Sequence, residues 1–128
     1  MGRFNSTYMV DGRLQYPFFP SMPVPYIKGN RFEVSNEGEA ISDSYMMPFD
    51  AELTGIAVAC NKYNDEDYWS LKVNDELILE TIYTKELPEG VFFMAVIPVS
   101  RGAEIKFIFN NKSGISKSVW YNLQFLRD

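Results

Sequence analysis

Hydrophobic and polar residues alternate along most of the chain, and turn-forming residues break the alternation about every eight to twelve positions. The last segment is the clearest example, because Val119, Tyr121, Leu123 and Phe125 alternate with residues of the opposite face. No stretch shows the convincing three-to-four-residue spacing of an amphipathic helix. The pattern therefore predicts an all-β chain.

The alternation divides the chain from residue 31 onward into eight or nine short strands. That number of strands without a helix, with a long connection early in the chain, is typical of an antiparallel two-sheet β-sandwich of the jelly-roll kind. An up-and-down barrel would need more uniform hairpins. The predicted strands cover 31–35, 44–48, 52–60, 69–73, 77–84, 91–99, 105–109 and 119–126.

Residues 69–84 predict a β-hairpin whose register depends on the length of its loop. A two-residue loop of Asn74 and Asp75 would place Trp69 opposite the charged Glu80. A three-residue loop, 74–76, keeps one face apolar, because it pairs Val73 with Leu77, Leu71 with Leu79 and Trp69 with Thr81. We therefore predict the three-residue loop, with one of its residues in the left-handed region.

The segment 16–26 has a different composition, with four prolines among aromatic residues. Proline fixes φ and removes a backbone donor, so the segment predicts an extended, polyproline-like arm. We divide the chain into an arm, 1–30, and a β-sandwich domain, 31–128. Because aromatic side chains need cover, the arm either packs along its own domain or docks onto an adjacent subunit. The candidate assembly residues are Phe18, Phe19, Met22 and Tyr26.

Length and charge narrow the class of protein. The length of 128 residues fits one globular domain. The net charge of −5 argues against nonspecific nucleic-acid binding. The charge is uneven, with net +3 over 1–31, −11 over 32–104 and +3 over 105–128. The basic ends are therefore expected to lie against the acidic middle of the same chain or of a neighbouring copy.

Histidine is absent and Cys60 is the single cysteine, so His-dependent catalytic triads and His or Cys zinc sites are excluded. Cys60 lies in an apolar strand pattern, where a free cysteine behaves as a small buried hydrophobe. The start of the chain leads into no signal-peptide run, and the apolar stretch 91–99 is far shorter than the ~20 residues of a membrane helix. We expect synthesis in the cytoplasm and no membrane partner.

Three kinds of chemistry remain to be weighed. The loop 61–67 is rich in oxygen ligands, so a sandwich-type calcium site at Asp65 and Asp67, with Asp50 as a further ligand, stands against an ordinary solvated acidic loop. The carboxylates fall at turns and on outer faces, so we expect no enzyme of the glycosidase type. Trp120 points away from the buried face of its strand, toward solvent or under the arm. With Tyr63 and Tyr68 it could form an aromatic face for sugar binding, although aromatic residues in sandwiches more often fill the core.

The residues that carry a resemblance lie in five segments, AELTGIAVA at 51–59, DYWSLKVND at 67–75, TKELPEG at 84–90, IPVSRGAEI at 97–105 and SKSVWYNLQF at 116–125. Together these segments resemble small jelly-roll proteins of tailed phages and prophages of Gram-positive bacteria. The likeness covers about residues 45–127 and rests on strand and turn order. It implies a virion component that decorates heads or tails or forms collars or fibres, often as a symmetric oligomer. We therefore expect a non-enzymatic, virion-associated homo-oligomer that contacts other virion proteins, with a carbohydrate-binding module for a cell-surface glycan as the alternative.

Overall fold

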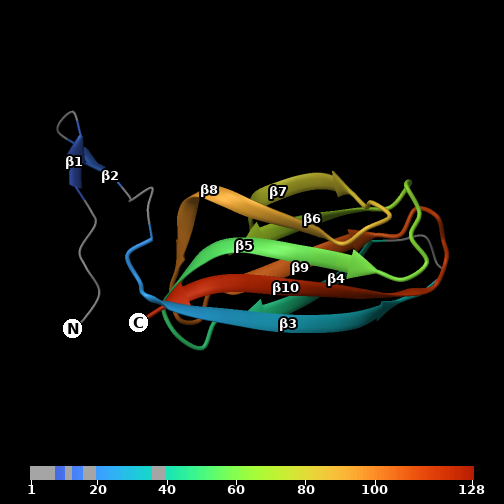
Figure 1. The fold of residues 1–128 in the computed structure, drawn as a ribbon, viewed down its shortest axis with the longest axis horizontal. Coiled ribbons are helices and arrows are strands. Elements are labelled where there is room, and N and C mark those ends of the chain that lie inside the picture. The colour runs from blue at the N-terminus through green and yellow to red at the C-terminus, as the bar shows by residue number, and fades with distance from the viewer. Residues whose placement is uncertain (1–7, 11–12, 16–19, 36–39) are drawn as a thin grey trace.

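The computed structural model describes residues 8–10, 13–15, 20–35 and 40–128 (Figure 1). All regular elements in these residues are strands. The described part of the chain contains no helix long and apolar enough to cross a bilayer. The strands are β1 (Tyr8–Val10), β2 (Arg13–Gln15), β3 (Val24–Val34), β4 (Ala40–Met46), β5 (Ala51–Cys60), β6 (Tyr68–Val73), β7 (Glu76–Tyr83), β8 (Glu89–Val99), β9 (Glu104–Asn110) and β10 (Lys117–Arg127).

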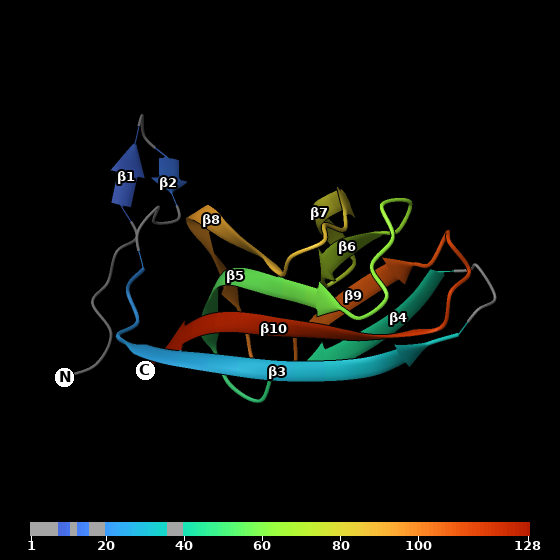
Figure 2. The ribbon, with the colours of Figure 1, turned by 45° about the vertical axis from the view of Figure 1, so that its right-hand side comes forward.

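Eight strands form two four-stranded antiparallel sheets that pack as a sandwich. The first sheet has the order β3-β10-β5-β8 and the second has the order β4-β9-β6-β7. The second sheet lies behind the first in Figure 1, and the turned view of Figure 2 separates the two. Because the chain passes from sheet to sheet along β3, β4, β5 and β6 and again along β7 to β10, this is jelly-roll connectivity, and the predicted fold class is confirmed. Strands β1 and β2 pair only with each other.

The core lies between the sheets and is built by the alternation that the sequence shows. On β10, Val119, Tyr121, Leu123 and Phe125 are all buried against the second sheet. Tyr121 stacks on Phe107 with ring centroids 4.4 Å apart. Such aromatic contacts add to the free energy gained by removing apolar surface from water. The period-two pattern thus positions one face of each sheet in the core and leaves the other face outside.

The predicted β6–β7 register is correct at one pair and wrong at two. Leu71 lies opposite Leu79 as predicted, but Val73 pairs with Glu76 and Trp69 pairs with Ile82. The loop has two residues, Asn74 and Asp75, and both have positive φ, as a tight I′-type turn requires. Register shifts on either side of Leu71 then bring the apolar residues together, so bulges rather than a longer loop keep the inner face apolar.

The first strand of the sandwich begins earlier than the sequence suggested. β3 starts at Val24, within the segment expected to be an arm, and pairs with β10 as far as Val24 opposite Arg127. Pro25 is compatible with this strand because β3 lies at the edge of its sheet, where one missing N–H is tolerated. The sandwich therefore includes residues 24–30, and the boundary between arm and domain that we predicted at 30 falls inside a strand.

Candidate interaction surface

The outer face of the first sheet carries almost no charge. Its outward positions alternate with the buried residues of β3, β10, β5 and β8. Between Arg31, which lies beside Trp120 at one end, and Glu52 at the other end, they include no Asp, Glu, Lys or Arg. We call this surface the apolar face. It consists of Pro25, Ile27 and Gly29 on β3, Trp120, Asn122, Gln124 and Leu126 on β10, Gly55, Ala57 and Ala59 on β5, and Gly90 and Phe92 on β8.

Large side chains on the apolar face are exposed, whereas the row across its middle contains three very small residues beside the exposed Asn122. The relative exposures are 63% for Ile27, 72% for Phe92 and 37% for Trp120. Gly29, Asn122, Ala57 and Gly90 form one cross-strand row that crosses the whole sheet. The Phe92 ring lies against this row, because a Cβ on Gly90 would come within 3.5 Å of it. Figure 1 shows no described strand lying across the face.

Strand β8 shapes one border of this face through a large irregularity. Between the pairs Gly55–Phe92 and Leu53–Ile97, β8 contains more residues than β5, so the intervening part of β8 bulges out of the ladder. Met94 lies in this bulge and is fully exposed. On the other side of the ladder, a Cβ on Gly55 would come within 2.6 Å of the Val91 carbonyl oxygen, which explains the glycine there.

The outer face of the second sheet is chemically different. Its outward positions carry hydroxyls and charges beside the exposed Met46, Leu77 and Tyr83, as the solvated face of an antiparallel sheet can. One row contains Ser44, Lys106 and Lys72, and the adjacent row contains Ser42, Ile108 and Ser70. The contrast shows that the lack of charge on the apolar face is a property of that face and not of the whole molecule.

A buried carboxylate fixes the start of the sandwich. Glu52 projects outward from β5 but is only 3% exposed, because the segment around Ser21 and Met22 covers it. Its Oε1 accepts hydrogen bonds from the backbone N–H groups of Ser21 and Met22 at 2.9 and 2.8 Å, and its Oε2 accepts one from Ser21 Oγ at 2.8 Å. These charge-assisted bonds hold the N-terminal segment against its own domain.

Two of the four candidate assembly residues of the arm lie in the part of the chain that the structure describes. Met22 is buried beside the Glu52 anchor, and Tyr26 belongs to β3, where its ring packs on Phe49 and Phe125. Both residues therefore pack within their own chain. Phe18 and Phe19 lie outside the described residues.

The three candidate sugar-binding aromatics do not form one surface. Trp120 lies on the apolar face, with Arg31 on one side and Ala59 on the other. Tyr68 projects from the opposite sheet, because its neighbour Trp69 is buried, and its ring lies 5.4 Å from that of Tyr83. Tyr63 is exposed in the loop after β5. The alternation would have placed Trp120 and Tyr68 on different faces of the molecule if the sheet to which each strand belongs had been known.

The candidate calcium ligands are also separated. Asp50 precedes β5 and accepts the N–H of Arg101, whereas Asp65 and Asp67 follow the far end of β5. Asp65 is exposed, but the carboxylate of Asp67 is fully buried and already accepts several hydrogen bonds. Among the described residues, no group of three or more acidic, Cys or His side chains is placed to hold a metal ion.

Asp67 instead forms a buried ion pair with Lys117, which the sequence analysis missed. Lys117 Nζ donates to Asp67 Oδ2 and to the Lys62 carbonyl oxygen, and both charged side chains are fully buried. Ser113 donates its N–H and its hydroxyl to the Asp67 carboxylate at 2.9 and 3.0 Å. The sequence does contain a signal for this burial, because Lys117 falls on the same alternating, inward-facing positions as Val119 and Tyr121. The pair ties the loop after β5 to the first residue of β10.

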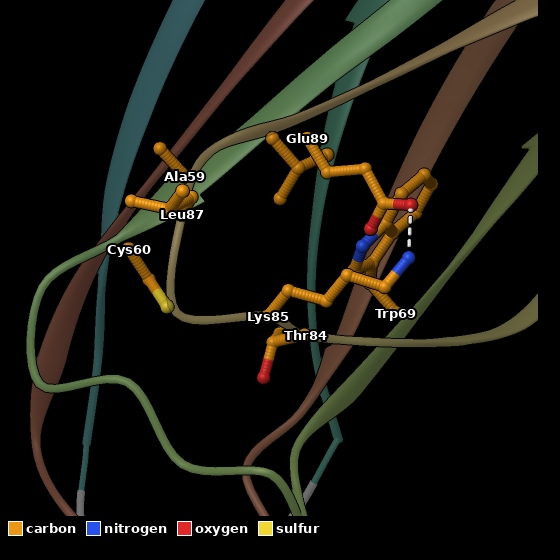
Figure 3. Close-up of a pocket in the computed structure, with 8 residues that line it drawn as sticks. Ala59, Cys60, Trp69, Thr84, Lys85, Leu87 and Glu89 are labelled. Carbon is orange, nitrogen blue, oxygen red and sulfur yellow. Dashed lines mark hydrogen bonds and ion pairs between the residues drawn. The ribbon is translucent and has the colours of Figure 1, made fainter.

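A small cavity lies beside Cys60 (Figure 3). Lys85 Nζ donates to Glu89 Oε1 at 2.7 Å at this site, and Leu87 also lines it. Burial raises the pKa of the Cys60 thiol, the Lys117 charge lowers it and the Asp67 charge raises it further. The cavity volume is about 10 Å³, which accommodates one water and no larger ligand.

Comparison with known proteins gives one match. Residues 23–128 match the family model of DUF8551, a domain of unknown function. No curated protein and no solved structure matches the chain. The matched region begins one residue before β3 and therefore coincides with the sandwich.

Proposed function

We propose that this chain, which belongs to the DUF8551 family, a domain of unknown function, is a non-enzymatic structural protein of a phage or prophage virion. It works through surface contacts in an oligomer. The observation that carries the proposal is the apolar face, which combines exposed Ile27, Phe92 and Trp120 with an absence of charged residues between Arg31 at one end and Glu52 at the other. Large uncharged patches on soluble proteins mark surfaces that bind a partner.

Two further considerations support this role. Jelly rolls occur in viral capsid and lectin domains, which is an argument from fold analogy alone. The resemblance of residues 45–127 to jelly-roll virion proteins points in the same direction. The proposed place of action is a virion assembled in the bacterial cytoplasm, and the proposed partners are other copies of the chain and other virion proteins.

The proposal is tested on particles purified from the bacterium or phage that encodes the chain. We expect quantitative mass spectrometry of purified particles to find peptides of this chain at a fixed copy number per particle, and immunogold labelling to locate them on the particle. Recovery of the chain only in the soluble fraction of the lysate, with none in the particles, would contradict a virion role.

A second measurement tests whether the arm or the sandwich is responsible for assembly. Light scattering of the full chain and of a variant lacking residues 1–19 compares their masses while β3 and the Glu52 anchor stay intact. Equal oligomeric masses assign assembly to the sandwich, and a monomeric truncated variant assigns it to the arm.

One observation favours a second function, carbohydrate binding. Trp120 and Asn122 both point outward from β10, so an exposed indole ring lies near an amide on the same face. Sugars stack on aromatic rings and hydrogen-bond to amides. A glycan array with the full chain and Trp120→Ala, each with and without calcium chloride, tests this function. Specific binding that Trp120→Ala abolishes supports it, and calcium dependence would implicate Asp65.

A further inference from the structure

We propose that Lys117 and Asp67 condense with each other inside the folded chain, forming an amide bond between Lys117 Nζ and Asp67 Cγ and releasing one water. The ion pair in the structure is the state from which this bond forms, once in each chain. The reaction goes beyond the proposed function and does not depend on it. Three features of the site support it: the contact between the reacting groups, their burial and the donors around the carboxylate.

The amine and the carboxylate are held in direct contact. Lys117 Nζ donates to Asp67 Oδ2 and also to the Lys62 carbonyl oxygen at 3.1 Å. The Asp67 backbone is fixed as well, because its N–H donates to the Asn64 carbonyl oxygen and its own carbonyl oxygen accepts the N–H of Thr84. Oδ2 is bonded to Cγ, so a small shift of the lysine chain brings the nitrogen to the ~3–3.5 Å from which it can attack that carbon.

Burial favours the neutral product over the ion pair. Both charged side chains are fully buried, and the Phe109 ring centroid lies 5.9 Å from Lys117 Nζ. A buried charge retains a desolvation cost even when it is paired, whereas an amide carries no charge. The same burial keeps away the water that would hydrolyse the amide. The interior of the sandwich therefore drives the condensation in the direction opposite to that in bulk water.

The donors around Asp67 match the steps of the reaction. A proton passes from Lys117 Nζ to Asp67 Oδ2 along their hydrogen bond, which leaves a neutral amine and a neutral acid. The nitrogen lone pair then attacks Cγ, and the electrons of the C=O bond move to Oδ1. The Ser113 N–H donates to Oδ1 at 2.9 Å and stabilises this negative charge.

The Ser113 hydroxyl completes the proton balance. It lies 3.0 Å from Asp67 Oδ2 and 3.4 Å from Lys117 Nζ, so it can carry a second proton from the nitrogen to Oδ2. The Cγ–Oδ2 bond then breaks and Oδ2 leaves as water, while the electrons on Oδ1 restore the C=O bond. The nitrogen loses two of its three protons, the water takes both, and no other reactant is needed.

The bond would join the two sheets of the sandwich. Asp67 directly precedes β6 in the second sheet, whereas Lys117 is the first residue of β10 in the first sheet. The two residues are 50 positions apart, and a covalent link that closes so long a loop restricts the unfolded chain. With a single cysteine, the chain cannot make such a link as an internal disulfide.

Asn111 is the other buried carbonyl group beside this site. Its Oδ1 accepts from Ser113 Oγ at 3.3 Å, but its Nδ2 donates to the carbonyl oxygens of Ser35 and Ile115 at 2.7 and 3.0 Å. Lys117 Nζ makes its hydrogen bond with Asp67 and none with Asn111 among the described residues. Condensation with Asn111 would release ammonia instead of water, so the two products are distinguishable by mass.

Mass spectrometry of the full chain, produced recombinantly, tests the proposal. We expect the intact chain to be lighter than its sequence mass by one water. Trypsin should release a branched peptide in which 63–72 is joined to 113–127 through Asp67 and Lys117, with no cleavage after Lys117. Lys117→Arg keeps a positive charge but removes the amine, so it should have its full sequence mass. Lys85→Arg, the same change in an exposed ion pair, should remain lighter by one water.

The peptides decide the outcome. Recovery of 63–72 and 118–127 as separate peptides from the folded wild type would overturn the proposal, even if the chain has lost a water elsewhere. Loss of one ammonia instead of one water would also overturn it. The wild-type peptides answer the question even if Lys117→Arg does not fold, which circular dichroism shows.

Ser113→Ala tests the proton transfer separately. The variant keeps the N–H at Oδ1 but lacks the hydroxyl, so it should contain an unlinked fraction that the wild type lacks. Complete linkage in this variant would overturn the step assigned to the hydroxyl.

Discussion

Gly55 shows how a single residue can control both the packing and the outer surface of a sheet. It lies where β5 approaches the bulged part of β8, and its missing side chain leaves space for the Val91 carbonyl oxygen. We expect Gly55→Ala to lower the free energy of unfolding by about 1–3 kcal/mol, because backbone must move to admit the methyl group. Urea unfolding followed by tryptophan fluorescence measures the change.

The matched control for that change is Gly90→Ala on the neighbouring strand. A Cβ at Gly90 meets only the Phe92 ring at 3.5 Å, which is ordinary contact. We expect this variant to be as stable as the wild type or slightly more stable, since alanine restricts the unfolded chain. Equal losses in both variants would show that steric crowding at Gly55 is not the cause.

Tyrosine ionisation gives a second prediction at the residue scale. Burial, with a hydrogen bond to Asp43 and that carboxylate's charge, raises the pKa of Tyr121 far above its usual value, and burial with a hydrogen bond to Tyr26 raises the pKa of Tyr45 to about 12. Both groups favour the protonated form in the folded state, so their contribution to stability is complete below about pH 10. It should fall as the pH rises from about 10 toward 12.

Urea midpoints between pH 9 and pH 12 measure this loss. Tyr121→Phe should be less stable at pH 9, because the 2.6 Å hydrogen bond to Asp43 is gone, but its stability should depend less on pH. An unchanged slope in the variant would contradict the assignment.

The β6–β7 turn is the clearest case in which an element's geometry is set by two residues. Asn74 and Asp75 have φ values of 49° and 64°, a conformation that glycine adopts without strain. We expect Asp75→Gly to raise the free energy of unfolding by a few tenths to about 1 kcal/mol, seen as a higher melting temperature. Asp65→Gly, at a loop position without positive φ, should give no gain.

The buried Asp67–Lys117 ion pair joins the loop after β5 to the start of β10. Removing either charge leaves the other one buried without its partner. We expect Lys117→Met to cost about 3–5 kcal/mol of unfolding free energy, because Asp67 would remain buried and unpaired. Arg31→Met removes one partner of the exposed Arg31–Glu33 pair and should cost less than about 1 kcal/mol. Chemical denaturation compares the two variants, and similar losses would refute the distinction.

The double change Asp67→Leu with Lys117→Met removes both charges. It should recover part of the stability that Lys117→Met loses. A double variant less stable than Lys117→Met would show that the loops need the charges themselves.

At the scale of the whole molecule, the anchor at Glu52 decides how the N-terminal segment leaves the sandwich. Glu52→Gln replaces a carboxylate that accepts from Ser21 and Met22 with an amide that also donates. We expect the Ser21 and Met22 amide hydrogens to exchange about 10–100-fold faster, in line with the loss of charge-assisted hydrogen bonds. Glu33→Gln on exposed β3 is the control, and equal exchange rates in both variants would contradict the anchor.

The sequence predicts much of this architecture because alternation is a local signal. It located the eight strands of the sandwich and the outward direction of Trp120. It could not reveal the apolar face, since Gly29, Ala57 and Gly90 are distant in the chain and meet only through the order β3-β10-β5-β8. It missed the pairing of Asp67 with Lys117 for a related reason, because a charged residue is assigned to solvent unless its partner is known.

The pairing of β3 with β10 also has a mechanical consequence. Val24 and Arg127 lie side by side at one end of two antiparallel neighbours, and Figure 1 shows the chain entering and leaving there. Tension applied between these two residues would peel β3 from β10 and break the hydrogen bonds between them one after another, starting at this end. Such loading needs far less force than sliding strands lengthwise. The Ser21–Glu52 contact precedes Val24 in the chain, so a pull on the N-terminal segment loads this contact before it loads the pairing of β3 with β10.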